Sequence, residues 1–161
     1  MSHVLRLGFI AFFAALTGTV PLLAVAQDTA PMDEQTPVDP ALFAPIPGNE
    51  ADLNEFIWKK RPVVVFADSA ADPAFVEQMR LLQDRWPELA ARDVVVIADT
   101  EPGIPSATRL KLRPRGFSLV LMTKDGQVSI RKPLPWDGRE IMRAIDKMPI
   151  RREEIRNGAG G

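Results

Sequence analysis

Residues 62–67 read PVVVFA, and residues 68–73 that follow them read DSAADP. The first stretch is continuously apolar and rich in β-branched valine, which is typical of a strand buried on both faces of a sheet. In the second stretch Asp72 is a good N-cap, and Pro73 suits the first position of a helix. The two stretches therefore predict a buried strand, a polar loop and a helix in succession.

The rest of the chain repeats this alternation of apolar runs and helical patterns. Strands are expected at 62–67, 93–98, 117–122 and 127–131, and helices at 53–57, from Pro73 to Pro87, within 105–112 and from Asp137 to Pro149. Strands joined through helices lie parallel, whereas the Asp125-Gly126 turn is a strong hairpin signal that adds an antiparallel strand. This order predicts a three-layer α/β/α sandwich whose central mixed sheet has about four strands.

The first 26 residues have the features of a secretory signal peptide. A weakly basic start precedes the apolar run LGFIAFFAAL at 7–16, and Ala24-Val25-Ala26 is a small-x-small cleavage site. A retained membrane anchor is the alternative, because the apolar stretch approaches the roughly twenty residues of a spanning helix. Pro21 and the cleavage site argue against an anchor. We therefore expect cleavage near Ala26/Gln27 and a periplasmic or secreted protein.

The remaining chain divides into three predicted regions. Residues 27–50 are acidic and rich in Pro, which favours a flexible linker, residues 51–150 form the α/β domain, and residues 151–161 are a charged and then Gly-rich tail. Loss of Arg6 with the signal would change the formal net charge from −1 to −2. This near-neutral total predicts no general affinity for nucleic acid, and we expect no stable membrane insertion after cleavage.

Missing residue types exclude several kinds of chemistry. The chain has no Cys, and its one His is His3, which lies within the predicted signal. A Cys nucleophile, a Ser-His-Asp relay and a His-ligated metal all need residues that the mature chain would lack. The protein is therefore not a thiol oxidoreductase or peroxidase. We expect no cofactor and favour a protein that is not an enzyme, although carboxylates, hydroxyls, Lys or Arg could still support catalysis.

Three segments carry a resemblance to a known fold. They are the strand at 62–67, the loop at 68–73 and the strand and turn at 117–126. Together with the element order, they resemble thioredoxin. Thioredoxins carry Cys-x-x-Cys in the first loop, where this chain has Ala70-Ala71-Asp72-Pro73, and a cis-Pro where it has Ser118. The resemblance thus implies the thioredoxin-like fold without its redox activity.

A second set of residues points to a narrower group. These residues are Trp58, Arg61-Pro62, the VVVFA strand, Asp72, Gln78, Arg92-Asp93-Val94-Val95 and Met148-Pro149-x-Arg151-Arg152-Glu153. They resemble the P-DUDES group, a thioredoxin-like family of unknown function found in exported bacterial proteins and in vertebrate sushi-repeat and matrix proteins. The resemblance covers residues 51–153. It implies an extracytoplasmic setting and an adhesion or binding role.

Acidic residues follow the first two predicted strands, where ligands of open α/β sheets tend to bind. They are Asp68, Ser69 and Asp72 after the first strand, and Asp99, Thr100 and Glu101 after the second. Such carboxylates could bind Ca²⁺ or Mg²⁺ or act as a general acid and base. Alternatively, Asp72 is an N-cap and the other residues are solvated loop positions.

Basic residues follow the second loop. Arg109, Lys111, Arg113 and Arg115 occupy alternate positions, which would place them on one side of an extended segment. Arg binds phosphate or carboxylate bidentately, and Ser118 and the backbone at Ser69 could complete an anion site. A solvated loop is the alternative. For Trp58, packing of the first helix on the sheet is favoured over an exposed interaction anchor.

Together these patterns favour a redox-inactive binding or interaction module in the periplasm. Its partner is unknown, and an envelope or extracellular protein fits the setting. A carboxylate-based metal-binding protein or enzyme and a periplasmic stress or chaperone-like protein are the alternatives. The candidate binding residues are Asp68, Ser69, Asp72, Asp99, Glu101, Arg113, Arg115 and Ser118.

Overall fold

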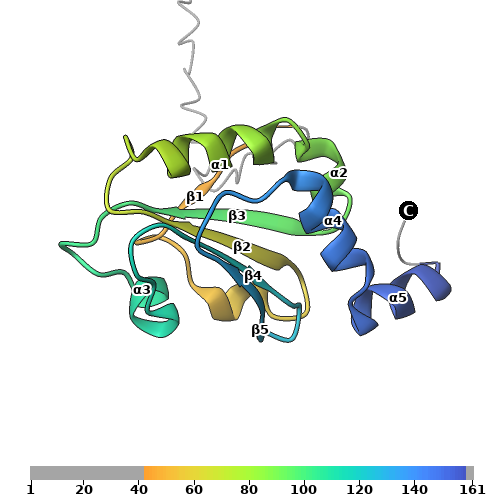
Figure 1. Cartoon of the computed structure of the whole chain (residues 1–161). Coiled ribbons are helices and arrows are strands. Elements are labelled where there is room, and N and C mark those ends of the chain that lie inside the picture. Colours follow the sequence, from red (N-terminus) through yellow and green to blue (C-terminus); the bar gives the residue numbers. More distant parts are fainter. Residues whose placement is uncertain (1–41, 159–161) are drawn as a thin grey trace, which may run out of the picture. The chain divides into compact units, whose positions relative to one another are not determined.

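A five-stranded mixed sheet forms the centre of the protein (Figure 1). The computed structural model describes residues 42–158, so the predicted signal peptide and residues 27–41 of the predicted linker lie outside the described residues. The strands are β1 Ile46–Pro47, β2 Arg61–Phe66, β3 Val94–Asp99, β4 Ser118–Met122 and β5 Val128–Lys132, in the spatial order β1-β3-β2-β4-β5. β1, β3 and β2 are parallel, whereas β4 and β5 add antiparallel pairs.

Helices cover both faces of this sheet, which confirms the predicted α/β sandwich. The helices are the 3₁₀ helix η1 Leu53–Phe56 and the α-helices α1 Pro73–Gln83, α2 Trp86–Ala90, α3 Ala107–Leu112, α4 Gly138–Asp146 and α5 Pro149–Arg156. Buried side chains of α1, α2 and α4 pack on one face of the sheet, and those of η1 and α3 pack on the other. Within residues 42–158, no helix combines the length and the apolar character that a bilayer crossing requires.

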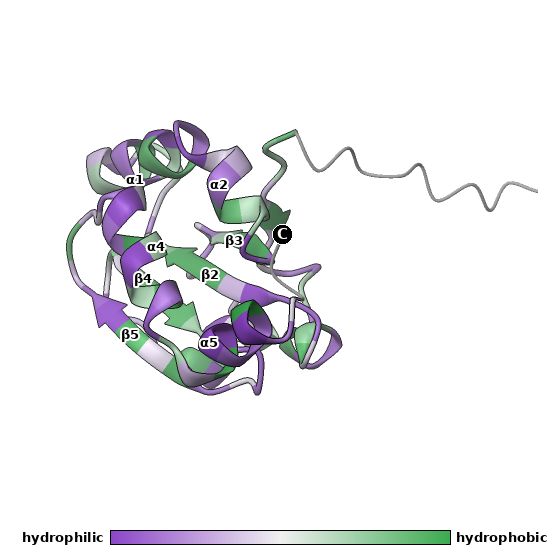
Figure 2. Ribbon diagram, turned by 90° about the vertical axis from the view of Figure 1, so that its right-hand side faces the viewer, coloured by the Kyte–Doolittle hydropathy of each residue, from purple (hydrophilic) through white to green (hydrophobic). Residues whose placement is uncertain are grey.

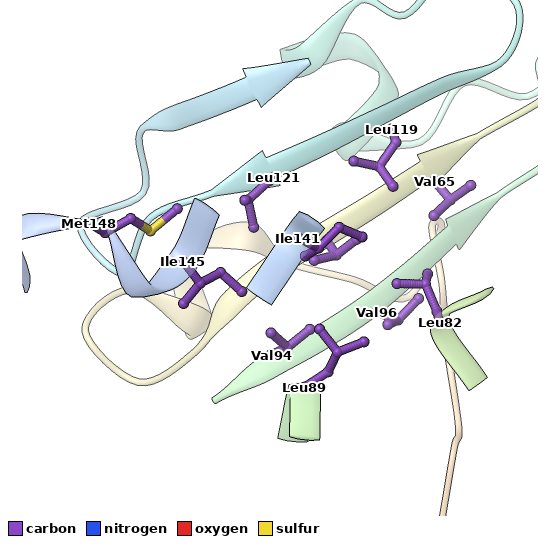
Figure 3. Packing of buried hydrophobic residues seen from close by; sticks show 11 residues of the cluster. Val65, Leu82, Leu89, Val94, Val96, Leu119, Leu121, Ile141, Ile145 and Met148 are labelled. Carbon is purple, nitrogen blue, oxygen red and sulfur yellow. The ribbon is translucent and has the colours of Figure 1, made fainter. Parts of the chain in front are cut away.

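The strand β2 explains why the stretch at 62–67 is apolar throughout. Side chains alternate between the two faces of a strand, so Val63 and Val65 face α1, α2 and α4, while Val64 and Phe66 face η1 and α3. All six residues of β2 are buried. Figure 3 shows the first of these two clusters, in which Ile141 and Ile145 of α4 lie against the sheet.

The sheet has one strand more than expected, because β1 comes from the end of the segment predicted to be a linker. Ile46 pairs with Ile97, and the N–H of Gly48 donates to the carbonyl of Ala98 at 2.8 Å. A Cβ atom at Gly48 would lie 2.6 Å from the Cβ of Asp99, so only glycine fits at this position. A two-residue strand that ends in Pro47 has no periodicity by which a sequence could reveal it.

Two helices also differ from the prediction. The helix expected from Pro73 to Pro87 is divided, because α1 ends at Gln83 and Pro87 lies in the first turn of α2. Pro149, which was expected only to end α4, begins α5. Residues 151–156, expected as a charged tail, are therefore helical, and Arg151 is buried.

Candidate functional site

A buried ion pair lies at the carboxyl ends of β2 and β3. Nε and Nη2 of Arg109 donate to Oδ1 of Asp99 at 3.0 and 2.8 Å, and Nη2 also donates to the carbonyls of Ala67 and Asp99 at 2.9 Å. Oγ of Ser106 donates to Oδ2 of Asp99 at 2.6 Å. The side chains of Asp99 and Arg109 are only 3% and 10% exposed. Both carboxylate oxygens of Asp99 thus already accept short hydrogen bonds.

This pair fixes α3 to the sheet. Ser106 is the N-cap of α3 and accepts from the N–H of Arg109 at 2.9 Å, while the guanidinium of Arg109 lies 5.3 Å from the ring centre of Phe66. A cavity beside Asp99 has a volume of about 90 Å³, which is well below the several hundred Å³ of ordinary small-molecule sites. Asp99, predicted as a candidate ligand or base, therefore has a structural role here.

Asp72 and Ser69 build the loop that follows β2. Oδ1 of Asp72 accepts from the N–H groups of Ala74 at 2.8 Å and Phe75 at 3.4 Å, which confirms the N-cap interpretation. Oγ of Ser69 accepts from the N–H of Ala71 at 3.1 Å. The loop is thus held in shape by hydrogen bonds of its own.

Four other candidate residues, Asp68, Glu101, Arg113 and Arg115, are exposed around this loop, and Ser118 is half-buried. Because Phe66 pairs with Ser118, the loop after β2 lies beside the segment that enters β4. Oδ2 of Asp68 lies 4.0 Å from the position that a Cβ atom of Gly116 would take. Residues 67–72, 99–106 and 113–118 together form what we call the carboxyl edge.

The predicted basic stripe is not formed, because Arg109 and Lys111 lie in the helix α3 instead of an extended segment. Residues two positions apart on a helix point in different directions, and Arg109 forms an ion pair with Asp99. Arg113 ends α3 in a left-handed conformation with φ of 47°. The prediction of one-sided charges was therefore wrong, and only Arg113 and Arg115 remain exposed at the carboxyl edge.

Acidic side chains do not gather into a metal site in the described part of the chain. Among residues 42–158, no group of three or more His, Cys, Asp or Glu side chains could hold a metal ion. Over the same residues every peptide bond is trans, including the one at Ser118, where thioredoxins have a cis-Pro.

A network of buried and partly buried charges lies at the opposite end of the sheet, and no pattern in the sequence indicates it. Arg61, at the start of β2, is 1% exposed; its Nη2 donates to Oε2 of Glu154 at 2.8 Å and its Nη1 to the carbonyl of Arg92 at 2.9 Å. Nζ of Lys124 lies 2.8 Å from both Oε1 of Glu154 and Oδ2 of Asp93. The network fixes α5 to β2 and to the end of β4.

Glu154 is the central anion of this network. Burial raises the pKa of its carboxyl, but hydrogen bonds from Lys124 and Arg61 and the charge of Arg61 outweigh that effect and hold the pKa at about 2, against an ordinary 4.5. Next to it, Arg92 binds Asp146 at 2.9 and 3.0 Å with two nitrogens. Arg61 and Arg92 are among the residues that carry the P-DUDES resemblance. No short-range sequence pattern, however, connects them with Glu154.

Trp58 lies beside this network and is 66% exposed, so the prediction that it packs on the sheet was wrong. Its φ of 63° is a left-handed conformation that bulky residues rarely adopt. The backbone N–H of Trp58 donates to the carbonyl of Lys124 at 2.6 Å. Ile57, instead of Trp58, lies against the turn, since a Cβ at Gly126 would be 3.5 Å from its side chain.

The sequence itself places the chain in a family. It matches the family described as "Domain of unknown function (DUF4174)" over residues 52–104 and 105–154, more than half of its length. The chain belongs to the DUF4174 family. The residues matched to DUF4174 run from just before η1 into α5, so they contain both the Asp99–Arg109 pair and the network around Glu154.

Proposed function

We propose that this DUF4174 domain is a redox-inactive binding module that acts outside the cytoplasm and holds an envelope or extracellular protein at its carboxyl edge. The observation that carries the proposal is the Asp99–Arg109 pair, in which both carboxylate oxygens accept hydrogen bonds from within the fold. A general base must be within hydrogen-bond reach of its substrate, whereas the Asp99 side chain is 3% exposed and both of its oxygens accept hydrogen bonds from within the fold. The buried ionic chemistry at this edge therefore serves to hold the loops in place.

The exposed part of the carboxyl edge has the mixed character of a protein-binding surface. Ile104 is 79% exposed in the loop after β3, and Leu110, on the helix α3 that joins two segments of this edge, is 62% exposed. Asp68, Ser69, Arg113 and Arg115 are exposed at this edge, and Asp68 lies close to Gly116. Apolar side chains surrounded by Arg and polar groups are typical of protein interfaces.

The proposed setting rests on the first 26 residues and on the P-DUDES resemblance. A signal peptide with an A-V-A cleavage site would export the domain, and a thioredoxin-like fold without Cys-x-x-Cys would retain the scaffold while losing thiol chemistry. The P-DUDES resemblance implies an adhesion or binding role, which agrees with this proposal. The same reasoning makes the periplasm or the extracellular space the site of action.

A calorimetric melt of the mature chain with and without Ca²⁺ or Mg²⁺ separates this proposal from a carboxylate-based metal protein. A cation that binds only the folded state at a hundredfold excess over its Kd would raise the stability by about 2.7 kcal/mol. We expect no such rise, because Asp99 is paired with Arg109 and Asp72 caps α1. A cation-dependent rise that disappears in Asp68→Asn or Glu101→Gln would favour the metal-binding alternative.

A further inference from the structure

The charge of the protein is unevenly distributed in space. The segments that meet around Glu154 are 58–61, 92–93, 124–125 and 146–156, and we call this end of the molecule the Trp58 pole. These segments carry nine Lys and Arg and five Asp and Glu, a formal net charge of +4, although the whole chain has −1. The near-neutral total charge therefore does not show that one end of the molecule is basic.

Most carboxylates of the Trp58 pole are already neutralised. Glu154 pairs with Arg61 and Lys124, Asp146 with Arg92, and Glu153 with Arg156. By contrast, four exposed cations form no ion pair with any residue in the range 42–158. They are Lys59, Lys60, Lys147 and Arg152. The unpaired charge that this pole presents to solvent is thus predominantly positive.

Two exposed apolar side chains accompany these cations. Trp58 is 66% exposed on the turn before β2, and Ile155 is 53% exposed on α5. Figure 2 views the molecule from the side on which α5 lies, and the ribbon of α5 there is mostly hydrophilic. An indole ring has an apolar body and a polar N–H, and it is favoured at the boundary between lipid headgroups and acyl chains.

From this juxtaposition we infer that the Trp58 pole adsorbs to an anionic lipid surface, with Trp58 among the headgroups and the four cations on the phosphates. The cations come from the turn before β2, the connection between α4 and α5, and α5 itself. Cations that come from several segments suit a laterally extended anionic surface better than a single acidic peptide. Each cation near such a surface strengthens binding about fivefold.

This inference is independent of the proposed function, because the pole and the carboxyl edge lie at opposite ends of β2 and β3. Adsorption through the pole would leave the carboxyl edge directed away from the membrane and open to a protein. Either surface can fail its own test without affecting the other.

Co-sedimentation of the mature chain with lipid vesicles tests the inference. We expect binding to vesicles of phosphatidylcholine and phosphatidylglycerol at roughly 70:30, weak binding to pure phosphatidylcholine, and release when salt rises from about 20 to about 300 mM. Lys59→Gln with Lys60→Gln should weaken binding about 25-fold, since each cation contributes about fivefold. The matched control, Lys111→Gln with Arg139→Gln, removes two exposed cations elsewhere and should leave binding within about twofold.

Trp58→Gly separates loss of binding from loss of folding. Glycine adopts a φ of 63° without strain, so this variant should keep or raise the melting temperature while it loses vesicle binding. Absence of binding to the anionic vesicles at low salt would overturn the inference. Equal binding by Trp58→Gly and the unmodified chain would do so too. Binding to poly-glutamate but not to the vesicles would assign the pole to an acidic protein instead.

Discussion

Arg61, which is buried, and Arg109, whose side chain is 10% exposed, form ion pairs at opposite ends of the sheet. Arg109, on α3, donates to backbone carbonyls at the carboxyl ends of β2 and β3. Arg61 connects β2 with α5 through its hydrogen bond to Glu154. A buried ion pair contributes little compared with an apolar pair, but removal of one partner leaves a charge that is costly to bury. Loss of the acidic partner of either arginine is therefore expected to destabilise the fold.

Glu154→Gln should lower the free energy of unfolding at neutral pH by about 3 kcal/mol, because the pKa of Glu154 is about 2 instead of 4.5. The folded-state pKa is the lower one, so this contribution is complete above about pH 4.5 and is lost as the pH falls toward 2. Urea denaturation across this range measures both effects.

Glu153→Gln is the matched control for this variant. The Glu153 side chain is 63% exposed and lies 3.8 Å from Arg156, so its loss should change the stability by less than about 0.5 kcal/mol. Equal effects of the two substitutions would show that α5 is not held by the network around Glu154.

Local interactions were predictable at single residues, and distant ones were not. Asp72 is the expected N-cap, because a cap bonds backbone groups two or three positions along the chain, and Asp137 caps α4 at its predicted start. Glu154 is 93 residues from Arg61, and no pattern in the sequence joins them. Trp58 was misassigned because large aromatic residues are usually buried, whereas the left-handed turn here directs Ile57 inward instead.

At the scale of elements, the short strand β1 depends on one glycine. β1 extends the parallel part of the sheet by only two residues, and Gly48 continues it with a hydrogen bond to Ala98. The close approach of Gly48 to Asp99 also places β1 next to the pair that fixes α3. The strand β1 and the carboxyl edge therefore pack against each other where Gly48 meets Asp99.

Gly48→Ala should destabilise the protein by about 1–3 kcal/mol, since the added methyl group would lie 2.6 Å from the Cβ of Asp99. Gly103→Ala is the comparison, because a Cβ at Gly103 meets no atom within 4 Å and should change little. Thermal melts of both variants decide the matter: similar melting temperatures would mean that β1 does not pack as closely as described.

The elements that the sequence failed to predict share a physical cause. β1 is too short for periodicity, and α5 has few apolar residues, so charge pairing instead of an apolar face holds it in place. The division between α1 and α2 falls before Pro87 because proline is tolerated in a first turn but not in a helix interior. The strands β2 and β3 were predicted closely, because a strand buried on both faces shows in the sequence as a continuous run of apolar residues.

The whole molecule has two chemically different ends. At the carboxyl edge Asp99 and Arg109 are paired and the exposed groups are mixed, whereas the Trp58 pole presents unpaired cations and an exposed indole. The α/β sandwich could be predicted because it follows from the order of the elements. The difference between the ends could not, because it depends on which charges find partners in three dimensions.

The central claim, that the carboxyl edge holds a protein, is tested most directly by photocrosslinking in intact cells of the native host. A photoreactive amino acid would replace Ser69 or Arg115 at this edge, or Arg139 on α4 as a control, all three being exposed. We predict one or a few discrete protein adducts from positions 69 and 115 and none of these from position 139. No adduct from either edge position, or the same adducts from all three, would contradict the claim.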